Sequence, residues 1–167
     1  MKFIITTAFF LFLTVGVQAQ NGKVIIEGSV QTEGVIPTNL EQIEPTQHTL
    51  VTVYCQDEII EQFFATAEGK FDYVLNPGFE YTVIFSKSGY FEKQLVYNLK
   101  DTPKEEFEGD VVASKVTLHE NDESEAMTEL SYIPAAKCFY DTKKGSIAWD
   151  IAYQQKMNER YYSLAMQ

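Results

Sequence analysis

The chain has 167 residues, of which 13 are basic and 24 are acidic, and its formal net charge is −11 at pH 7. A surface of this sign repels phosphates, which argues against nucleic acids and anionic lipids as partners. Ten tyrosines and twelve phenylalanines supply two of the residue types that are favoured in half-buried β-strands.

The N-terminal segment has the pattern of a secretory signal peptide. A single cation, Lys2, precedes an apolar or small run that ends at Val17, and this run is shorter than the roughly 20 residues that a membrane-spanning helix needs. Ala19 offers a small residue where a signal peptidase reads the chain. We therefore expect residues 1–19 to be a signal peptide, with an uncleaved anchor as the alternative. The mature chain would have no transmembrane segment and would be exported to the periplasm, the outer surface or the extracellular space.

The next hundred residues alternate between apolar and polar side chains with a period of two, as half-buried strands do. The alternation occurs in residues 23–30, 50–56, 63–75, 80–99 and 110–120. Turn signals recur at intervals of about 8–12 residues, which is typical of antiparallel sandwiches and barrels. Parallel βαβ units would need helical crossovers, and the pattern contains none. We predict a mainly β protein, in which residues 20–119 form a seven-stranded antiparallel Greek-key β-sandwich.

Residues 120–131 are acidic and offer little to bury, so that we expect a linker there. Residues 132–167 are expected to form a β-hairpin and one C-terminal α-helix, with Asp150 as its N-cap. The helix would bury one stripe of side chains, in the i, i+4, i+8 and i+11 positions. These are Tyr153, Met157, Tyr161 and Leu164.

Two proline-marked loops interrupt the strand pattern. The polar loop Gln31–His48 carries two prolines and is longer than most connections, and its role stays open. The second loop, residues 100–109, is charged and contains one proline.

The glycines and prolines of residues 68–92 are predicted to be turn residues. Gly69 suits a positive φ in a hairpin turn, and Pro77 followed by Gly78 suits a type II turn. Gly89 and Tyr90 mark a third turn or a bulge. None of these glycines precedes a helix, so we expect no phosphate-binding loop.

Residues 66–95 resemble the second half of a carboxypeptidase-regulatory-like, transthyretin-like (prealbumin-like) module. That family has a D-x-x-G-x-F turn, matched in part by residues 67–71, and then the P-G pair of Pro77 and Gly78, a strand opening on Tyr81, and the G-Y pair of Gly89 and Tyr90. The resemblance covers about residues 23–99 and implies a β-sandwich without catalytic residues. The long loop at residues 31–48 departs from the short turn of the family. More loosely, the K-x-x-Y-D hairpin at residues 137–141 is similar to the tails of small secreted proteins of Gram-negative bacteria.

No catalytic, cofactor-binding or metal-ligating residues are predicted. His48 and His119 lack the spacing of zinc motifs. The acidic run 120–125 lacks the glycine and alternation of a calcium loop, and no G-x-S-x-G element is present. We therefore expect the protein not to be an enzyme.

Cys55 and Cys138 are the two cysteines. Export permits a disulfide between them. Cys55 also shares a strand face with Val51 and Val53, so that a buried apolar thiol is an equal alternative.

These patterns favour a non-enzymatic secreted binding or assembly module of the bacterial cell envelope, whose partner is an envelope protein. Tyr140, Trp149 and Tyr153 would form a protein interface or close the core. A carbohydrate-binding module, with a glycan as partner, is the first alternative. An accessory domain of an envelope enzyme complex is the second.

Overall fold

A computed structural model describes residues 22–33, 48–121 and 125–165. The elements run in the order β1 (Val24–Glu33), β2 (Leu50–Cys55), β3 (Glu58–Phe64), β4 (Lys70–Leu75), β5 (Glu80–Ser86), β6 (Lys93–Asn98), β7 (Asp110–His119), α1 (Glu125–Ser131), β8 (Ala136–Asp141), β9 (Ser146–Trp149) and α2 (Ile151–Ala165). The expected signal peptide and most of the polar loop 31–48 lie outside the described residues.

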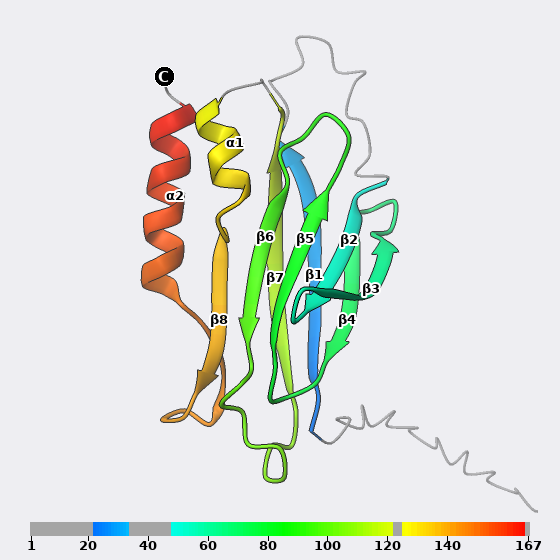
Figure 1. Cartoon of the computed structure of the whole chain (residues 1–167), viewed down its shortest axis with the longest axis vertical. Coiled ribbons are helices and arrows are strands. Elements are labelled where there is room, and N and C mark those ends of the chain that lie inside the picture. Colours follow the sequence, from blue (N-terminus) through cyan, green and yellow to red (C-terminus); the bar gives the residue numbers. More distant parts are fainter. Residues whose placement is uncertain (1–21, 34–47, 122–124, 166–167) are drawn as a thin grey trace, which may run out of the picture.

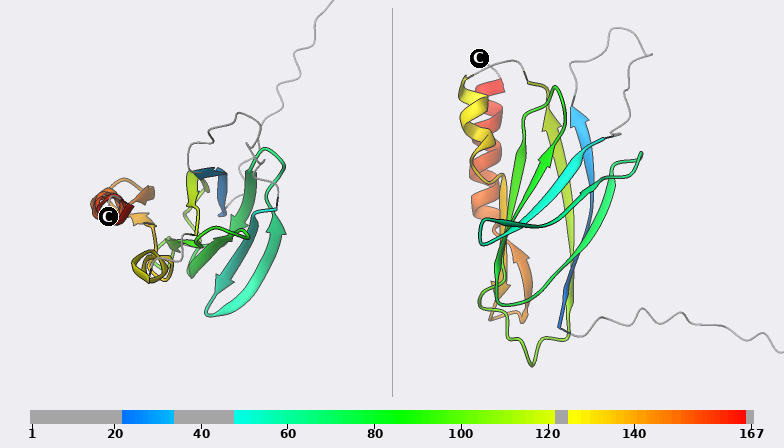
Figure 2. Two further views of the ribbon diagram at one scale, coloured as in Figure 1. Left: turned by 90° about the horizontal axis from the view of Figure 1, so that it is seen from above. Right: turned by 45° about the vertical axis from the view of Figure 1, so that its right-hand side comes forward.

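The strands form two sheets, as Figure 1 and Figure 2 show. One has three strands in the order β4-β1-β7, and the other has six in the order β3-β2-β5-β6-β8-β9. The predicted mainly β, sandwich-like architecture is confirmed. The prediction that residues 20–119 form an antiparallel sandwich is wrong for one pair, because β1 and β7 are parallel. The first strand of the C-terminal hairpin, β8, also pairs in parallel, with β6.

The core lies between the sheets and is built from alternate side chains of each strand. In β4 the buried positions are Phe71, Tyr73 and Leu75, whereas the intervening residues are exposed. The same alternation holds along β5 and on the facing side of β7. Tyr97 on β6 is fully buried, and its hydroxyl lies 3.0 Å from the hydroxyl of Ser114 on the opposite sheet. This contact links the two layers through the middle of the core.

Two of the predicted turns join strands of different sheets. Gly69, with φ of 75°, lies between β3 and β4, which belong to separate sheets. The expectation of a hairpin at this position is therefore wrong. Gly78, with φ of 91°, follows Pro77 and carries the chain from β4 back to β5. Gly89, with φ of 82°, does lie in a hairpin turn between the paired strands β5 and β6.

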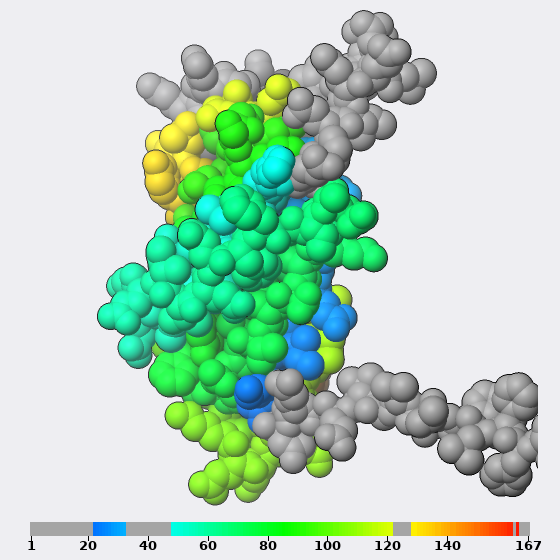
Figure 3. Space-filling model, turned by 90° about the vertical axis from the view of Figure 1, so that its right-hand side faces the viewer, coloured from blue at the N-terminus to red at the C-terminus, as the bar shows by residue number. Residues whose placement is uncertain are grey.

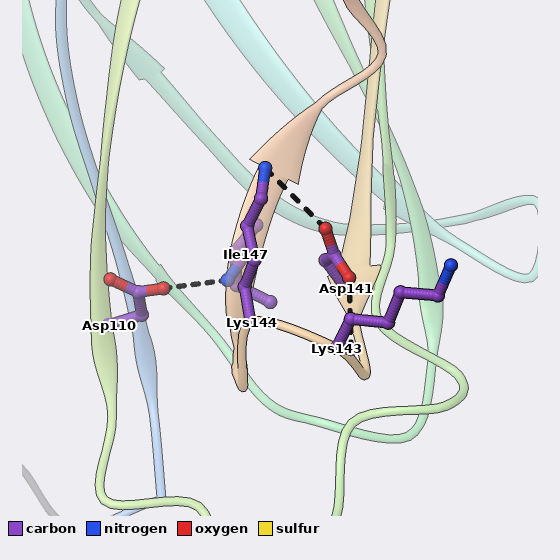
Figure 4. Close-up of polar contacts among 5 residues, drawn as sticks. All are labelled: Asp110, Asp141, Lys143, Lys144 and Ile147. Carbon is purple, nitrogen blue, oxygen red and sulfur yellow. Dashed lines mark hydrogen bonds and ion pairs between the residues drawn. The ribbon is translucent and has the colours of Figure 1, made fainter.

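The C-terminal hairpin extends the six-stranded sheet and reaches across to the other one (Figure 4). Asp141 holds the turn by accepting a hydrogen bond from the backbone N–H of Lys143 at 3.0 Å. The carboxylate of Asp110, at the start of β7, accepts the backbone N–H of Ile147 at 2.7 Å. The indole N–H of Trp149 donates to the carbonyl oxygen of Ala113 on β7 at 3.1 Å. The hairpin therefore closes one side of the sandwich.

The two helices lie beside β8 at this closed side (Figures 1 and 2). Asp150 caps α2 as predicted, because its carboxylate accepts the N–H of Tyr153 at 2.9 Å. Met157 and Tyr161 of the predicted stripe are buried, and Tyr153 is half-buried. The side chain of Leu164 lies outside the described residues. Among the described helices, none has the length and hydropathy that crossing a bilayer requires.

The expected linker at residues 120–131 contains a helix instead. Leu130 at the end of α1 is fully buried, and it belongs to a second apolar cluster with Phe91, Met157 and Tyr161. The sequence pattern showed no apolar partner for α1, because the side chains that cover Leu130 come from the β5–β6 connection and from α2. The helix is thus stabilised by packing rather than by its own short sequence.

We predict that the substitution Gly28→Ala destabilises the protein. Gly28 lies in β1 opposite Phe71 and Ser114, and a Cβ there would collide with the Phe71 ring and the Ser114 carbonyl oxygen. Overpacking of this kind costs about 1–3 kcal/mol. Thermal unfolding followed by circular dichroism measures the effect, with Ser29→Ala on the outer face of the same strand as the control. Equal melting temperatures of the two variants would contradict this packing.

Candidate interaction surface

Strand β3 is an edge strand of the six-stranded sheet. Among the described strands it pairs with β2 alone, so that one side of its backbone has no strand partner there. The residues of β2 and β3, coloured turquoise, lie at the surface of the molecule in Figure 3. The unpaired N–H and C=O groups of such an edge are a template for a further strand.

The geometry of this edge is set by a tight turn and a bulge. Gln56 and Asp57 connect β2 to β3 with φ of 52° and 66°, the left-handed pair that a two-residue hairpin turn needs. The register then shifts, because Val53 pairs with Glu61 whereas Tyr54 pairs with Ile59. Ile60 is left as the extra residue of a bulge, which increases the local twist of the strand.

The edge carries exposed apolar side chains. Ile59, Ile60 and Phe64 are 56%, 52% and 63% exposed. They are three of the nine exposed large apolar residues in the described part of the chain, on one strand of seven residues. Phe63 points the other way and packs against Tyr73 with a centroid distance of 6.2 Å. Exposed apolar side chains on an open edge mark a binding surface or an aggregation site.

Acidic side chains flank this apolar surface. Asp57, Glu58 and Glu61 are exposed, and no Lys or Arg occurs between residues 56 and 69. Charged residues on an edge strand discourage pairing with a like-charged strand. They also favour a strand of opposite charge. The β3 edge, defined by residues 57–64, is thus both apolar and negative.

A shallow hollow of about 600 Å³ lies on the outer face of the same sheet, next to the turn at Asp57. Its floor includes Tyr54, Thr82 and Ile84. Lys100 lines it and pairs with Glu80 at 3.4 Å. This hollow gives room for side chains of a segment bound near the β2–β3 turn.

The residues predicted for an interface close the core instead of forming an exposed patch. Trp149 is half-buried, and its ring meets Tyr97 edge-on at 5.7 Å. Tyr140 packs against Phe107 at 6.0 Å. Tyr153 donates its hydroxyl to the carbonyl oxygen of Pro134 at 2.7 Å. Tyr140 and Trp149 thus hold the hairpin onto the sandwich, and Tyr153 holds α2 to the segment before β8.

The two cysteines are free thiols in this structure. They lie in one row of the six-stranded sheet, in which Cys55 pairs with Tyr81, Tyr81 with Tyr97, and Tyr97 with Cys138. Three strand spacings amount to roughly 14 Å, about twice the Cα separation that a disulfide allows. Of the two alternatives, this spacing disfavours the disulfide and favours unlinked thiols.

The histidines do not approach one another. His48 lies edge-on to Phe64 at 6.4 Å, and His119 stacks on Tyr161 at 5.7 Å. Within the described ranges, no group of three or more His, Cys, Asp or Glu side chains is placed to hold a metal ion.

The sequence pattern did not indicate the β3 edge. Residues 58–62 break the alternation, since two isoleucines stand between two glutamates. An apolar pair flanked by acids after a Gln-Asp turn is a signal of an edge strand with a bulge. The position of β3 at the edge of the sheet, however, depends on the pairing of the other five strands.

Comparisons with known proteins add little to this geometry. No protein-family model and no curated protein matches the sequence. Similar solved structures include the Bacillus anthracis TIE protein (17% identity, TM-score 0.37, 57% of this chain and 16% of that chain). They also include 3-chlorocatechol 1,2-dioxygenase from Rhodococcus opacus 1CP (12%, 0.37, 62% and 62%) and two B repeats of the Staphylococcus aureus collagen-binding protein (15%, 0.33, 71% and 25%). Likenesses this weak carry no argument about function.

We predict that the two thiols differ in reactivity in the folded protein. Burial raises the pKa of the Cys138 thiol to about 12, so that it stays protonated near pH 8 and unreactive. Cys55 is half-buried at the margin of the core and is expected to react with iodoacetamide. Mass spectrometry should show one label on the native protein and two after denaturation without a reductant. No labelling after denaturation would reveal a disulfide and contradict this placement.

Proposed function

We propose that this protein is an exported, non-enzymatic assembly module of the bacterial cell envelope that binds a protein partner through the β3 edge. The observation that carries this proposal is the open edge strand with Ile59, Ile60 and Phe64 exposed. Strand addition supplies affinity through backbone hydrogen bonds and specificity through alternate side chains. We also propose that the chain carries a signal peptide and that β1–β7 form a carboxypeptidase-regulatory-like module. The arrangement of β1–β7 in two sheets supports this module.

The partner segment is extended and carries cationic and apolar side chains. Asp57, Glu58 and Glu61 attract Lys or Arg, and the exposed isoleucines bury apolar residues of the incoming strand. A second copy of this chain fits poorly, because it would bring the same acids to the same edge on a protein of net charge −11. The favoured occupant is therefore a basic, apolar segment of another envelope protein.

The alternative of a carbohydrate-binding module finds less support at Trp149. A sugar platform needs an exposed aromatic face. Trp149 is instead half-buried, hydrogen-bonded to Ala113 and packed against Tyr97. An accessory role in an enzyme complex differs from the proposal only in the identity of the partner, which the experiment below determines.

Site-specific photocrosslinking in intact cells tests the proposal. A benzoylphenylalanine residue replaces Ile59 in one full-length variant and Val111 in a second. Val111 is also 56% exposed but lies on β7 in the other sheet. We expect a discrete adduct from position 59 and none from position 111, and the crosslinked peptide should contain Lys or Arg among apolar residues. Adducts of equal yield at both positions, or an adduct of two copies of this chain, would contradict the proposal.

The charge of the edge is tested in the same assay. In the variant with the crosslinker at position 59, the additional substitution Glu61→Lys should lower the adduct yield about tenfold. A tenfold decrease corresponds to a loss of about 1.4 kcal/mol in binding free energy. The matched control is Glu27→Lys, which makes the same change at an exposed position of β1. An unchanged yield with Glu61→Lys would remove the electrostatic argument for a cationic partner.

A further inference from the structure

A second hollow lies on the opposite side of the molecule, between α2 and the two sheets. It encloses about 660 Å³, a volume in the range of small-molecule sites. Five elements contribute to it, namely the end of β1, the end of β7, the starts of β6 and β8, and the middle of α2. We call it the α2 cleft. It exists because the C-terminal hairpin places α2 beside β8, next to the ends of β1 and β7.

The charge of the α2 cleft is opposite to that of the protein. Lys93 and Lys115 line it, and none of its described lining residues is Asp or Glu. In the whole chain, acidic residues outnumber basic ones by 24 to 13. A cationic hollow in an acidic surface concentrates small anions locally, although the net charge repels large polyanions.

Neutral hydrogen-bonding groups surround these cations. Gln154 and Asn158 of α2 and Thr117 of β7 line the cleft. Gln31 donates its side-chain amide to the Thr117 hydroxyl at 3.1 Å, which fixes the position of both groups. Amides and hydroxyls of this kind pair with the hydroxyl groups of a sugar. Leu95 and Val116 add an apolar floor.

An aromatic ring holds the charged side of the cleft in place. Tyr161 is buried and directs its hydroxyl to the carbonyl oxygen of Leu130 at 3.5 Å. The ammonium of Lys93 lies 4.6 Å from the centre of its ring, and His119 stacks on the same ring at 5.7 Å. Burial raises the pKa of Tyr161 to about 12, so that the ring stays neutral. The ammonium of Lys93 is thus preorganised, which lowers the entropic cost of binding.

From this geometry we infer that the α2 cleft binds a small acidic sugar, that is, a saccharide with one carboxylate. Lys93 and Lys115 pair with the carboxylate, and the amides and Thr117 pair with the ring hydroxyls. A phosphate ester fits less well, because no arginine lines the described part of the cleft and the first three residues of α2 do not line it. Both are common elements of phosphate sites. This site lies apart from the β3 edge, and its test is independent of the proposed function.

Titration of the ¹⁵N-labelled mature chain with sodium D-glucuronate, followed by NMR, tests the inference. We expect saturable shifts at Thr117, Gln154 and Asn158, and binding of D-glucose about tenfold weaker, because it lacks the charge-assisted hydrogen bonds. Shifts that do not saturate, equal binding of D-glucose, or tighter binding of D-glucose 6-phosphate would each overturn it.

The chain offers a matched pair of lysines for this experiment. Lys93 lies 4.6 Å from the centre of the Tyr161 ring inside the cleft, and Lys137 lies 4.5 Å from that of Tyr153 outside it. Lys93→Gln should weaken glucuronate binding about tenfold, and so should Lys115→Gln at an exposed position that tolerates change. Lys137→Gln should leave the affinity unchanged. Equal affinity in all three variants, with unchanged circular dichroism, would contradict the assignment.

Discussion

The contact between the C-terminal hairpin and β7 is the constraint on which the remaining structure depends. Ile147 donates its backbone N–H to Asp110, and Trp149 donates its indole N–H to Ala113. Both bonds cross from the six-stranded sheet to the three-stranded sheet. They tie β9, the last strand of its sheet, to the other sheet, and so help to fix the start of α2, which follows directly.

This closure makes the two sides of the sandwich unequal. On the closed side, the hairpin satisfies backbone groups and sets α2 against the sheet ends, which creates the cationic α2 cleft. On the other side, β3 ends the sheet with its isoleucines exposed. The cationic α2 cleft suits a small anion, and the acidic β3 edge suits a cationic strand. The two sites lie at opposite sides of one core.

The local structure was predictable where one side-chain pattern decides it. The alternation of Phe71 and Tyr73 identified β4, and Asp150 identified the start of α2, since each signal acts within a few residues. The pairing of strands was not predictable in this way. Alternation shows which side chains of a strand face the core, but it does not show which strand lies next to it. The turn at Gly69 was therefore predicted to be a hairpin, although it joins strands of two different sheets.

The candidate sites were not predictable from the sequence either, because they too depend on how separate elements pair and pack. The edge position of β3 follows from the order of the whole sheet. The α2 cleft collects Lys93, Lys115 and Gln154 from three separate elements, and no spacing rule connects them. Aromatic residues that the sequence pattern did indicate, such as Trp149, pack against the core. They supply the apolar and hydrogen-bonded contacts through which the hairpin docks.

Residue-resolved hydrogen exchange of the backbone amides tests the asymmetry of the two sides most directly. We expect the amide of Ile147, which is bonded to Asp110, to be protected. Alternate amides of residues 59–64 in β3 should exchange rapidly in the free protein. Rapid exchange at Ile147, or protection throughout β3 equal to that of β5, would contradict this asymmetry.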